Sequence, residues 1–192
     1  LGILQARGGQ MDAARASLQR GLEEAAAARN QRHVALACKS LGRLALERRQ
    51  YEEAADRLSK AAEGTSSMGM HAETAQTLCF LGQLEMERGA PDRASGYLQE
   101  AEALSREQEF PTCRMLSLLH QDRLDTDEGR QAVTAYLENE PAIEFAERME
   151  LRFLLWQKTH EAQHLEVAKR LLDELVEHAP PEWRESMLED VR

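Results

Sequence analysis

The stretch QTLCFLGQLEMERGAPDRASGYLQEA (Gln76–Ala101) reads as two amphipathic helices joined by a short turn. Apolar residues recur every three or four positions in both segments, which is typical of helices that bury one side. Pro91 and Asp92 suit the start of the second helix, because proline and an acidic side chain are both favourable in a first helical turn. The stretch therefore predicts a helical hairpin, and it places a glycine, Gly82, in the middle of the first helix.

This glycine belongs to a repeat of forty residues. Glycine inside a helix costs about 1 kcal/mol relative to alanine, yet the same Leu-Gly pair occurs three times in fixed phase, at Leu1-Gly2, Leu41-Gly42 and Leu81-Gly82. Four other positions recur in register: Leu4, Leu44 and Leu84; Ala14, Ala54 and Ala94; Leu18, Leu58 and Leu98; Gly21, Ala61 and Ala101. We interpret the glycines as points where the two helices of a hairpin approach most closely, facing Ala14, Ala54 and Ala94.

The repeated residues carry a family resemblance. A Leu-Gly pair, an alanine twelve residues after the glycine, a large apolar residue four later and a small residue three after that resemble the tetratricopeptide repeat. That repeat usually has about 34 residues. The forty here is similar to a longer variety, with extended helices or loops at AARNQRHVA and GTSSMGMHA, and with Gly64 ending a second helix. Cys38 and Leu78 stand where the family has a large aromatic residue.

The resemblance implies an all-α, right-handed superhelical solenoid of antiparallel helix pairs, with about five repeats and a C-terminal capping helix. The expected divisions of this single domain are clear repeats at 1–30, 31–70 and 71–110, degenerate repeats at 111–140 and 141–180, and a cap at 181–192. In the fourth repeat His120 replaces the glycine and DTDEG (Asp125–Gly129) is the expected turn. In the fifth, Trp156 replaces the glycine and Ala168 follows twelve residues later.

The two ends of the sequence suggest a larger context. The chain starts at Leu1 without a methionine, apparently partway through a helix, which predicts a piece of a longer protein. The final segment, PPEWRESMLEDVR, is similar to tails that follow tetratricopeptide arrays in large bacterial kinase- or ATPase-linked regulators.

Composition narrows the classes of function. The net charge of −10 argues against a general nucleic-acid or anionic-membrane binder. No apolar run is long enough to span a bilayer. The three cysteines, Cys38, Cys79 and Cys113, lack metal-ligand spacing and suit a reducing cytoplasm. We expect a cytoplasmic chain with no cofactor and no nucleic-acid or membrane partner.

The most suggestive string for catalysis is HEAQH (His160–His164), which matches the zinc motif H-E-x-x-H. In a metalloprotease both histidines lie on one helix and face one zinc ion. Here the repeat phase places the string at the turn between two helices, so a solvated turn is the favoured interpretation. No glycine-rich phosphate loop and no nucleophile with a histidine–carboxylate pair occur in the sequence. We expect no enzymatic activity, no catalytic residue and no metal site.

Binding is expected on the inner side of a stacked array, which the first helix of each pair lines. Helical spacing places four residues of each copy there: Leu36, Lys39, Arg43 and Leu46; Gln76, Cys79, Gln83 and Met86; Arg114, Ser117, Gln121 and Leu124; Glu150, Phe153, Gln157 and His160. The residue after the glycine reads Ile3, Arg43, Gln83, Gln121 and Gln157 along the copies. Long donors and acceptors of this kind suit an extended peptide.

Two classes of function follow. The first is a protein–protein interaction module that binds a peptide or protein, possibly a domain of the same polypeptide, as the regulatory part of a multidomain signalling protein. The second is a structural or self-association module, in which the degenerate end repeats form a homodimer surface. Family members that hold a C-terminal carboxylate use a lysine, an asparagine and further basic residues; Lys39 and Arg43 match this in part, but no asparagine follows. The expected partner-binding set is Lys39, Arg43, Gln76, Gln83, Met86, Arg114, Gln121 and Gln157.

Overall fold

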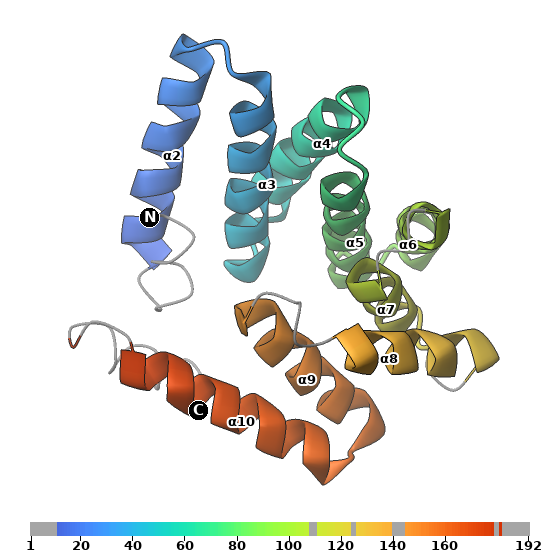
Figure 1. The fold of residues 1–192 in the computed structure, drawn as a ribbon. Coiled ribbons are helices and arrows are strands. Elements are labelled where there is room, and N and C mark those ends of the chain that lie inside the picture. The colour runs from blue at the N-terminus through green and yellow to red at the C-terminus, as the bar shows by residue number, and fades with distance from the viewer. Residues whose placement is uncertain (1–10, 108–110, 124–125, 140–144, 179–180, 182–192) are drawn as a thin grey trace.

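The computed structural model describes residues 11–107, 111–123, 126–139, 145–178 and 181. All secondary structure in these ranges is helical, which confirms the predicted all-α class. Consecutive helices pack against each other along the chain (Figure 1). The nine helices described are α2 (Met11–Ala27), α3 (Gln31–Glu47), α4 (Tyr51–Ser67), α5 (His71–Glu87), α6 (Pro91–Glu107), α7 (Pro111–His120), α8 (Asp127–Asn139), α9 (Phe145–Thr159) and α10 (Ala162–His178).

The helices α2 to α6 are each 17 residues long and are joined by three-residue connectors. In every connector the second residue has a positive φ, at Arg29, Arg49, Gly69 and Gly89. The third residue donates its N–H to a carbonyl five residues back, as in Ala90 N to Glu85 O at 2.8 Å, which is the bond that closes a Schellman motif. The identical connectors give each helix a period of twenty residues, half of the sequence repeat.

The regular connectors show whether the extra length of the repeat lies in its helices or in its loops. Apart from their connector residues, the segments AARNQRHVA and GTSSMGMHA are helical, so the repeat is long because its helices are long. The prediction that Gly64 ends a helix is wrong, because α4 continues to Ser67. A Cβ at Gly64 would lie 3.0 Å from Cβ of Ala35 in α3. This glycine therefore permits a close approach between helices.

Gly42 and Gly82 lie where the two helices of their hairpins cross, as expected. A Cβ on Gly42 would lie 2.7 Å from Cγ of Leu58, and one on Gly82 would lie 2.6 Å from Cγ of Leu98. The sequence predicts Ala54 and Ala94 as the partners, one helical turn earlier. Both alanines are buried, but the atoms nearest the glycines belong to the leucines. In the hairpins α3–α4 and α5–α6, a leucine of the second helix therefore fills the space above a glycine of the first, and we call this space the glycine notch.

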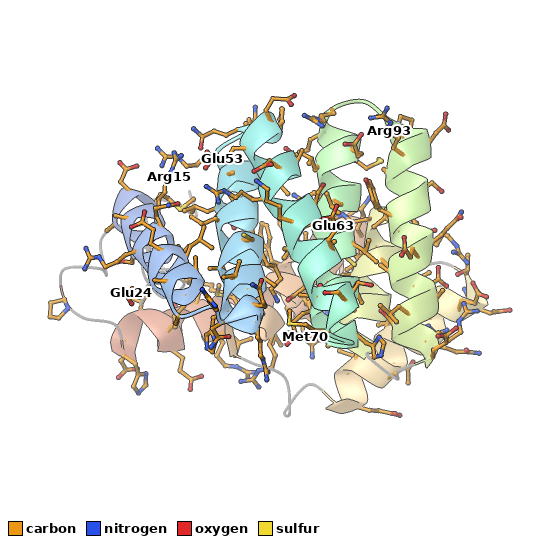
Figure 2. All side chains as sticks on the ribbon, turned by 90° about the horizontal axis from the view of Figure 1, so that it is seen from above. Arg15, Glu24, Glu53, Glu63, Met70 and Arg93 are labelled. Carbon is orange, nitrogen blue, oxygen red and sulfur yellow. The ribbon has the colours of Figure 1, made fainter. Side chains whose placement is uncertain are left out.

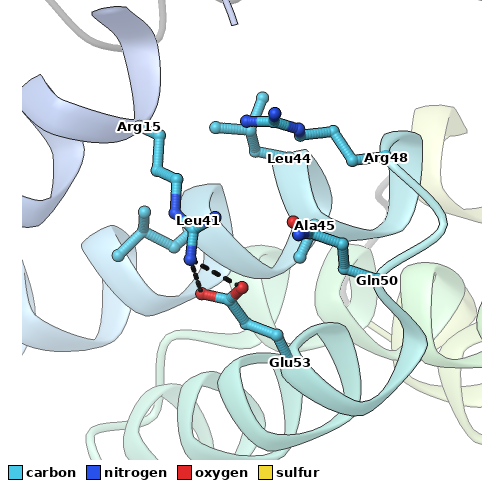
Figure 3. Close-up of a pocket in the computed structure, with 7 residues that line it drawn as sticks. All are labelled: Arg15, Leu41, Leu44, Ala45, Arg48, Gln50 and Glu53. Atoms are coloured by element: carbon cyan, nitrogen blue, oxygen red, sulfur yellow. Dashed lines mark hydrogen bonds and ion pairs between the residues drawn. The ribbon is translucent and has the colours of Figure 1, made fainter. Parts of the chain in front are cut away.

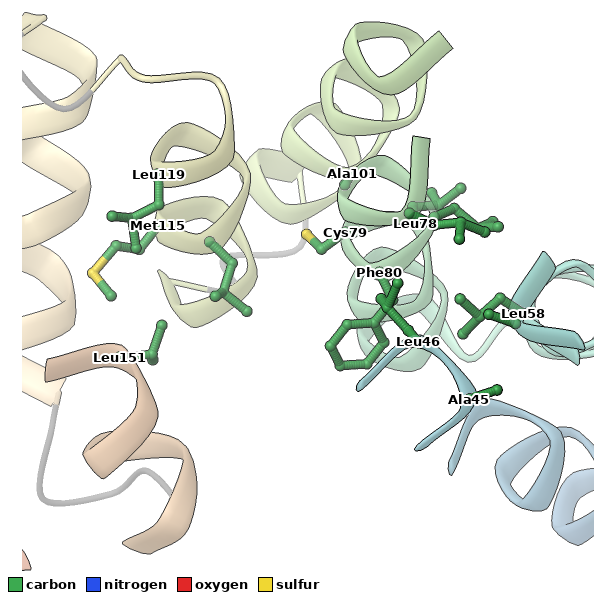
Figure 4. Packing of buried hydrophobic residues seen from close by; sticks show 14 of the residues in the cluster. Ala45, Leu46, Leu58, Leu78, Cys79, Phe80, Ala101, Met115, Leu119 and Leu151 are labelled. Carbon is green, nitrogen blue, oxygen red and sulfur yellow. The ribbon is translucent and has the colours of Figure 1, made fainter. Parts of the chain in front are cut away.

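From α2 to α7, neighbouring hairpins pack mainly through the second helix of one and the first helix of the next, and successive first helices also contact each other. We call α3, α5, α7 and α9 the first helices, and α2, α4, α6, α8 and α10 the second helices. Each first helix contacts the next one, and Figure 1 shows them along the inner side of a curved array. The core runs between them: Phe80 lies beside Leu46, and Leu151 beside Met115 (Figure 4). The second helices turn charged side chains outward, as Figure 2 shows for Glu24, Glu63 and Arg93.

Ion pairs repeat along the stack at a sequence separation of 36 residues. Each joins the end of a first helix to the preceding hairpin: Arg48–Asp12 at 2.7 Å, Arg88–Glu52 at 2.5 Å and Lys158–Asp122 at 3.0 Å. The acidic partners are almost fully exposed, so each pair contributes about 1 kcal/mol or less. These pairs align neighbouring hairpins rather than hold them together.

The second half of the array departs from the period. The helix α7 has only 10 residues. The predicted turn at Asp125–Gly129 is wrong for Asp127–Gly129, which form the first turn of α8, and Asp125 lies outside the described residues. Thr126 caps α8, since its Oγ1 accepts a hydrogen bond from Gly129 N at 3.0 Å. Residues 1–10, which include Gly2 and Ile3, lie outside the described residues, as do Leu124 and all but the first residue of the expected cap at 181–192.

Candidate functional site

The structure brings together three side chains of the expected binding row, Lys39, Arg43 and Gln76, at the α3–α5 seam. Lys39 Nζ donates to Gln76 Oε1 at 2.7 Å. Arg43 lies over the Phe80 ring, 5.4 Å from its centroid, and its Nε donates to Glu47 at 3.0 Å. Lys39, Arg43 and Gln76 are half-buried. They therefore join two first helices and also present polar atoms at the surface.

Phe80 is the member of this seam that sequence reasoning missed. It is buried, and the guanidinium of Arg43 covers part of its ring. A cation over an aromatic face contributes about 0.5–1 kcal/mol at a partly exposed site. The signal was present in the sequence, because Phe80 is four residues after Gln76 and so lies on the same side of the helix.

Gln83 and Met86 continue this surface toward the C-terminal end of α5. Gln83 is half-buried and donates to Glu87 at 3.1 Å. Met86 is 48% exposed, whereas Leu46, its equivalent forty residues earlier, is 3% exposed. Leu46 is covered because α5 packs beside it, while the shorter α7 ends at His120. We call the surface made by Lys39, Arg43, Gln76, Gln83 and Met86 the inner-face patch.

In the degenerate repeats, the placement of Arg114 and Gln157 on the inner face stays a prediction, whereas Gln121 departs from its expected place. Arg114 is half-buried on α7, and Gln157 is exposed near the end of α9. Gln121 follows α7 in the turn, where its Nε2 donates to Ser117 Oγ at 3.1 Å and faces Glu102 Oε2 at 3.4 Å. Gln121 therefore bonds within the α6–α7 junction. Its expected equivalents, Arg43 and Gln83, instead project from helices.

Three residues assigned to the inner row are buried, which corrects those assignments. They are Leu46, Cys79 and Ser117. Cys79 Sγ donates to Cys113 O on α7 at 3.7 Å, and Ser117 Oγ donates to Leu98 O on α6. The assignments fail because these positions point sideways at a neighbouring helix, which the spacing within one helix does not reveal. Phe153, placed in the same row, is 40% exposed and lies near Trp156, with ring centroids 5.5 Å apart and ring planes tilted by 41°.

The cysteines behave as small apolar core residues. Cys38, Cys79 and Cys113 are all buried free thiols. Burial, together with the nearby Cys113, raises the pKa of the Cys79 thiol well above its usual value. A thiol that is both buried and protonated is a poor nucleophile and a poor metal ligand.

The first two residues of the HEAQH string lie in a connector, as the repeat phase predicted, but the expected solvated turn is wrong for His164. His160 has a φ of 57° and lies between α9 and α10, while His164 is inside α10 and buried. His164 Nδ1 is 2.9 Å from Arg152 Nη1, a cation. Within the described ranges, no group of three or more His, Cys, Asp or Glu side chains is arranged to hold a metal ion.

A hollow between α2, α3 and α4 is too small to serve as a ligand site (Figure 3). Arg15 Nη2 donates to both carboxylate oxygens of Glu53, at 3.0 and 2.9 Å, and closes the hollow on one side. No interior room remains for a water molecule. Its lining is Arg15, Leu41, Leu44, Ala45, Arg48, Gln50 and Glu53. The hollow is a packing seam between two hairpins.

Comparison with known proteins gives no relative. The chain matches no protein family, no curated protein and no solved structure. No helix in the described part of the chain is long and apolar enough to cross a membrane.

Proposed function

We propose that this chain is a non-catalytic, tetratricopeptide-like interaction module whose stacked hairpins form a right-handed superhelical solenoid. Its inner-face patch binds an extended peptide or a protein segment, and the chain serves as the regulatory part of a larger signalling protein. The proposal rests on the periodic sequence, the glycine-notched hairpins and the contacts between successive first helices.

One observation carries the proposal: the inner-face patch combines polar and apolar side chains that remain partly exposed at the surface. The half-buried Gln83 and the largely exposed Met86 lie on one helix, beside the seam that holds Lys39 and Arg43. Amide and cationic groups next to an apolar side chain can bond a peptide backbone and receive one of its side chains. Methionine suits such a surface because it is unbranched and adapts to its neighbour.

Reversing two charges in the patch tests the proposal. Peptides would be selected from a random display library on the purified chain, and their affinity would be measured by calorimetry. The double variant Lys39→Glu/Arg43→Glu should weaken binding at least tenfold, because it removes two cationic donors and adds two carboxylates. Arg20→Glu/Lys60→Glu, which changes the same net charge at exposed positions of α2 and α4, is the control and should bind normally. Equal affinity of both variants would refute binding at this patch.

A second candidate, self-association, is favoured by exposed apolar side chains on the last hairpin. Phe153 of α9 is 40% exposed and Leu165 of α10 is 37% exposed. Cys79, which occupies the place of Phe153 in the third repeat, is instead buried against α7.

Light scattering at two protein concentrations distinguishes the two candidates. If the last hairpin forms a homodimer, the mass should double at the higher concentration, and Phe153→Asp should restore the monomer because it places a charge in the interface. A monomer at both concentrations contradicts self-association and leaves the inner-face proposal unaffected.

A further inference from the structure

Met86 is the most exposed methionine among the side chains that the structure describes. It is 48% exposed, whereas Met68 is 37% exposed and Met115 is fully buried. The same place in the preceding repeat holds Leu46, which is 3% exposed. A thioether therefore occupies a repeat position that faces solvent on α5, and a dissolved oxidant can reach it there.

Oxidation of Met86 would change the apolar member of the inner-face patch into a polar one. A peroxide transfers one oxygen atom to Sδ: the sulfur gives up an electron pair, the O–O bond breaks, and water or an alcohol leaves. The product is a sulfoxide, whose oxygen accepts hydrogen bonds from water. An apolar side chain of a bound peptide covers that oxygen only by removing its water, which costs free energy unless another donor replaces it.

We propose that Met86 is a modification site at which a peroxide switches off binding at the inner-face patch and a thiol-dependent reductase restores it. In the reverse step two thiols supply two electrons and two protons, the sulfoxide oxygen leaves as water, and a disulfide forms. The switch rests on the function proposed above, because the patch must bind a peptide for oxidation to prevent it. The array itself stays folded, since the oxygen is added to an exposed side chain while Met115 is shielded in the core.

Peroxide treatment of the purified chain tests the proposal with a selected peptide that lacks methionine and cysteine. Catalase would remove the hydrogen peroxide, peptide mapping would measure the conversion of each methionine, and calorimetry would measure the affinity. Met86 should convert faster than Met115. As Met86 converts, the affinity should fall by about fivefold to 150-fold, the effect of burying one polar group without a partner. The two methionine sulfoxide reductases, one for each epimer, should restore the affinity when a thiol reductant is present.

Three variants locate the effect. Met68→Leu, at an exposed position directly after α4, should bind like wild type and lose affinity in the same way on treatment. Met86→Gln, which places a polar amide in the patch, should bind more weakly without any peroxide. Peptides selected anew on Met86→Leu should bind that variant equally before and after treatment, because leucine has no sulfur to oxidise.

Unchanged affinity after full conversion of Met86 would overturn the proposal and leave the function proposed above standing. So would a loss of affinity that persists in Met86→Leu, or a loss of helical signal in circular dichroism, since either result places the damage elsewhere in the chain. Failure of the untreated chain to bind any peptide would instead refute both proposals.

Discussion

Replacing Gly82 by leucine should lower the free energy of unfolding by about 3 kcal/mol. The first side-chain carbon would lie 2.6 Å from two atoms of Leu98, well inside van der Waals contact. Leu98 is 1% exposed at the α5–α6 crossing, so its side chain is closely surrounded by other atoms. The pair of helices must therefore separate, and the loss exceeds the gain of about 1 kcal/mol from removing a helical glycine.

The chain contains a control for this change. Gly96 lies on α6 and is exposed, and a Cβ added to it would meet no atom within 4 Å. Gly96→Leu should leave stability unchanged or raise it by up to about 1 kcal/mol, because only the helix propensity improves. Urea unfolding followed by circular dichroism measures both. A Gly82→Leu variant as stable as wild type would show that the notch can open at no cost.

The position of the glycine notch was predictable because it is periodic, but the residue that fills it was not. The Leu-Gly pair recurs at a fixed spacing, which indicates a contact within each hairpin. Periodicity does not reveal how far one helix slides along the other, and that offset decides between Ala94 and Leu98 as the nearest residue. The prediction that Gly64 ends a helix failed for a related reason. A single glycine suggests a helix end, whereas this glycine is explained by the close approach of Ala35 on another helix.

For the inner-face patch, too, the sequence predicted positions within one helix but not contacts between helices. Helical spacing brings Arg43 and Gln83 to the surface because an angle within one helix depends only on sequence position. It could not show that Lys39 meets Gln76 or that Arg43 covers Phe80, because those contacts depend on the distance between α3 and α5. The exposure of Met86 depends on the length of α7, an element in which the repeat has drifted.

Two buried glutamates should respond in opposite ways to alanine, and Glu102→Ala should cost about 3 kcal/mol. Glu102 is 5% exposed. Its carboxylate accepts from Arg106 at 2.7 Å and from Arg123 at 2.9 Å, and it faces Gln121 at 3.4 Å. Two of these three partners belong to the turn after α7. Removing the carboxylate therefore leaves Arg106 and Arg123 with Glu128 of α8 as their remaining shared anion and releases the turn from α6.

Glu85→Ala should be neutral or stabilise the chain by up to about 1 kcal/mol. Glu85 is 6% exposed, but its Oε2 has no hydrogen-bond partner among the described residues, and Arg93 lies 3.9 Å away. Its remaining bond, to Arg88 at 3.3 Å, is long, and Arg88 also donates to Glu52. Alanine already occupies the same place in the preceding repeat, where Ala45 is buried in an equivalent hairpin.

Both glutamate variants would be compared with wild type by urea unfolding, with the helical signal in water as the check on folding. The expected order of midpoints is Glu85→Ala at or above wild type and Glu102→Ala well below it. Burial alone would predict equal effects, since the two side chains are equally removed from water. A difference of the expected sign therefore means that the number of partners, and not depth, decides whether a buried carboxylate stabilises this array. Equal losses in the two variants would contradict that conclusion.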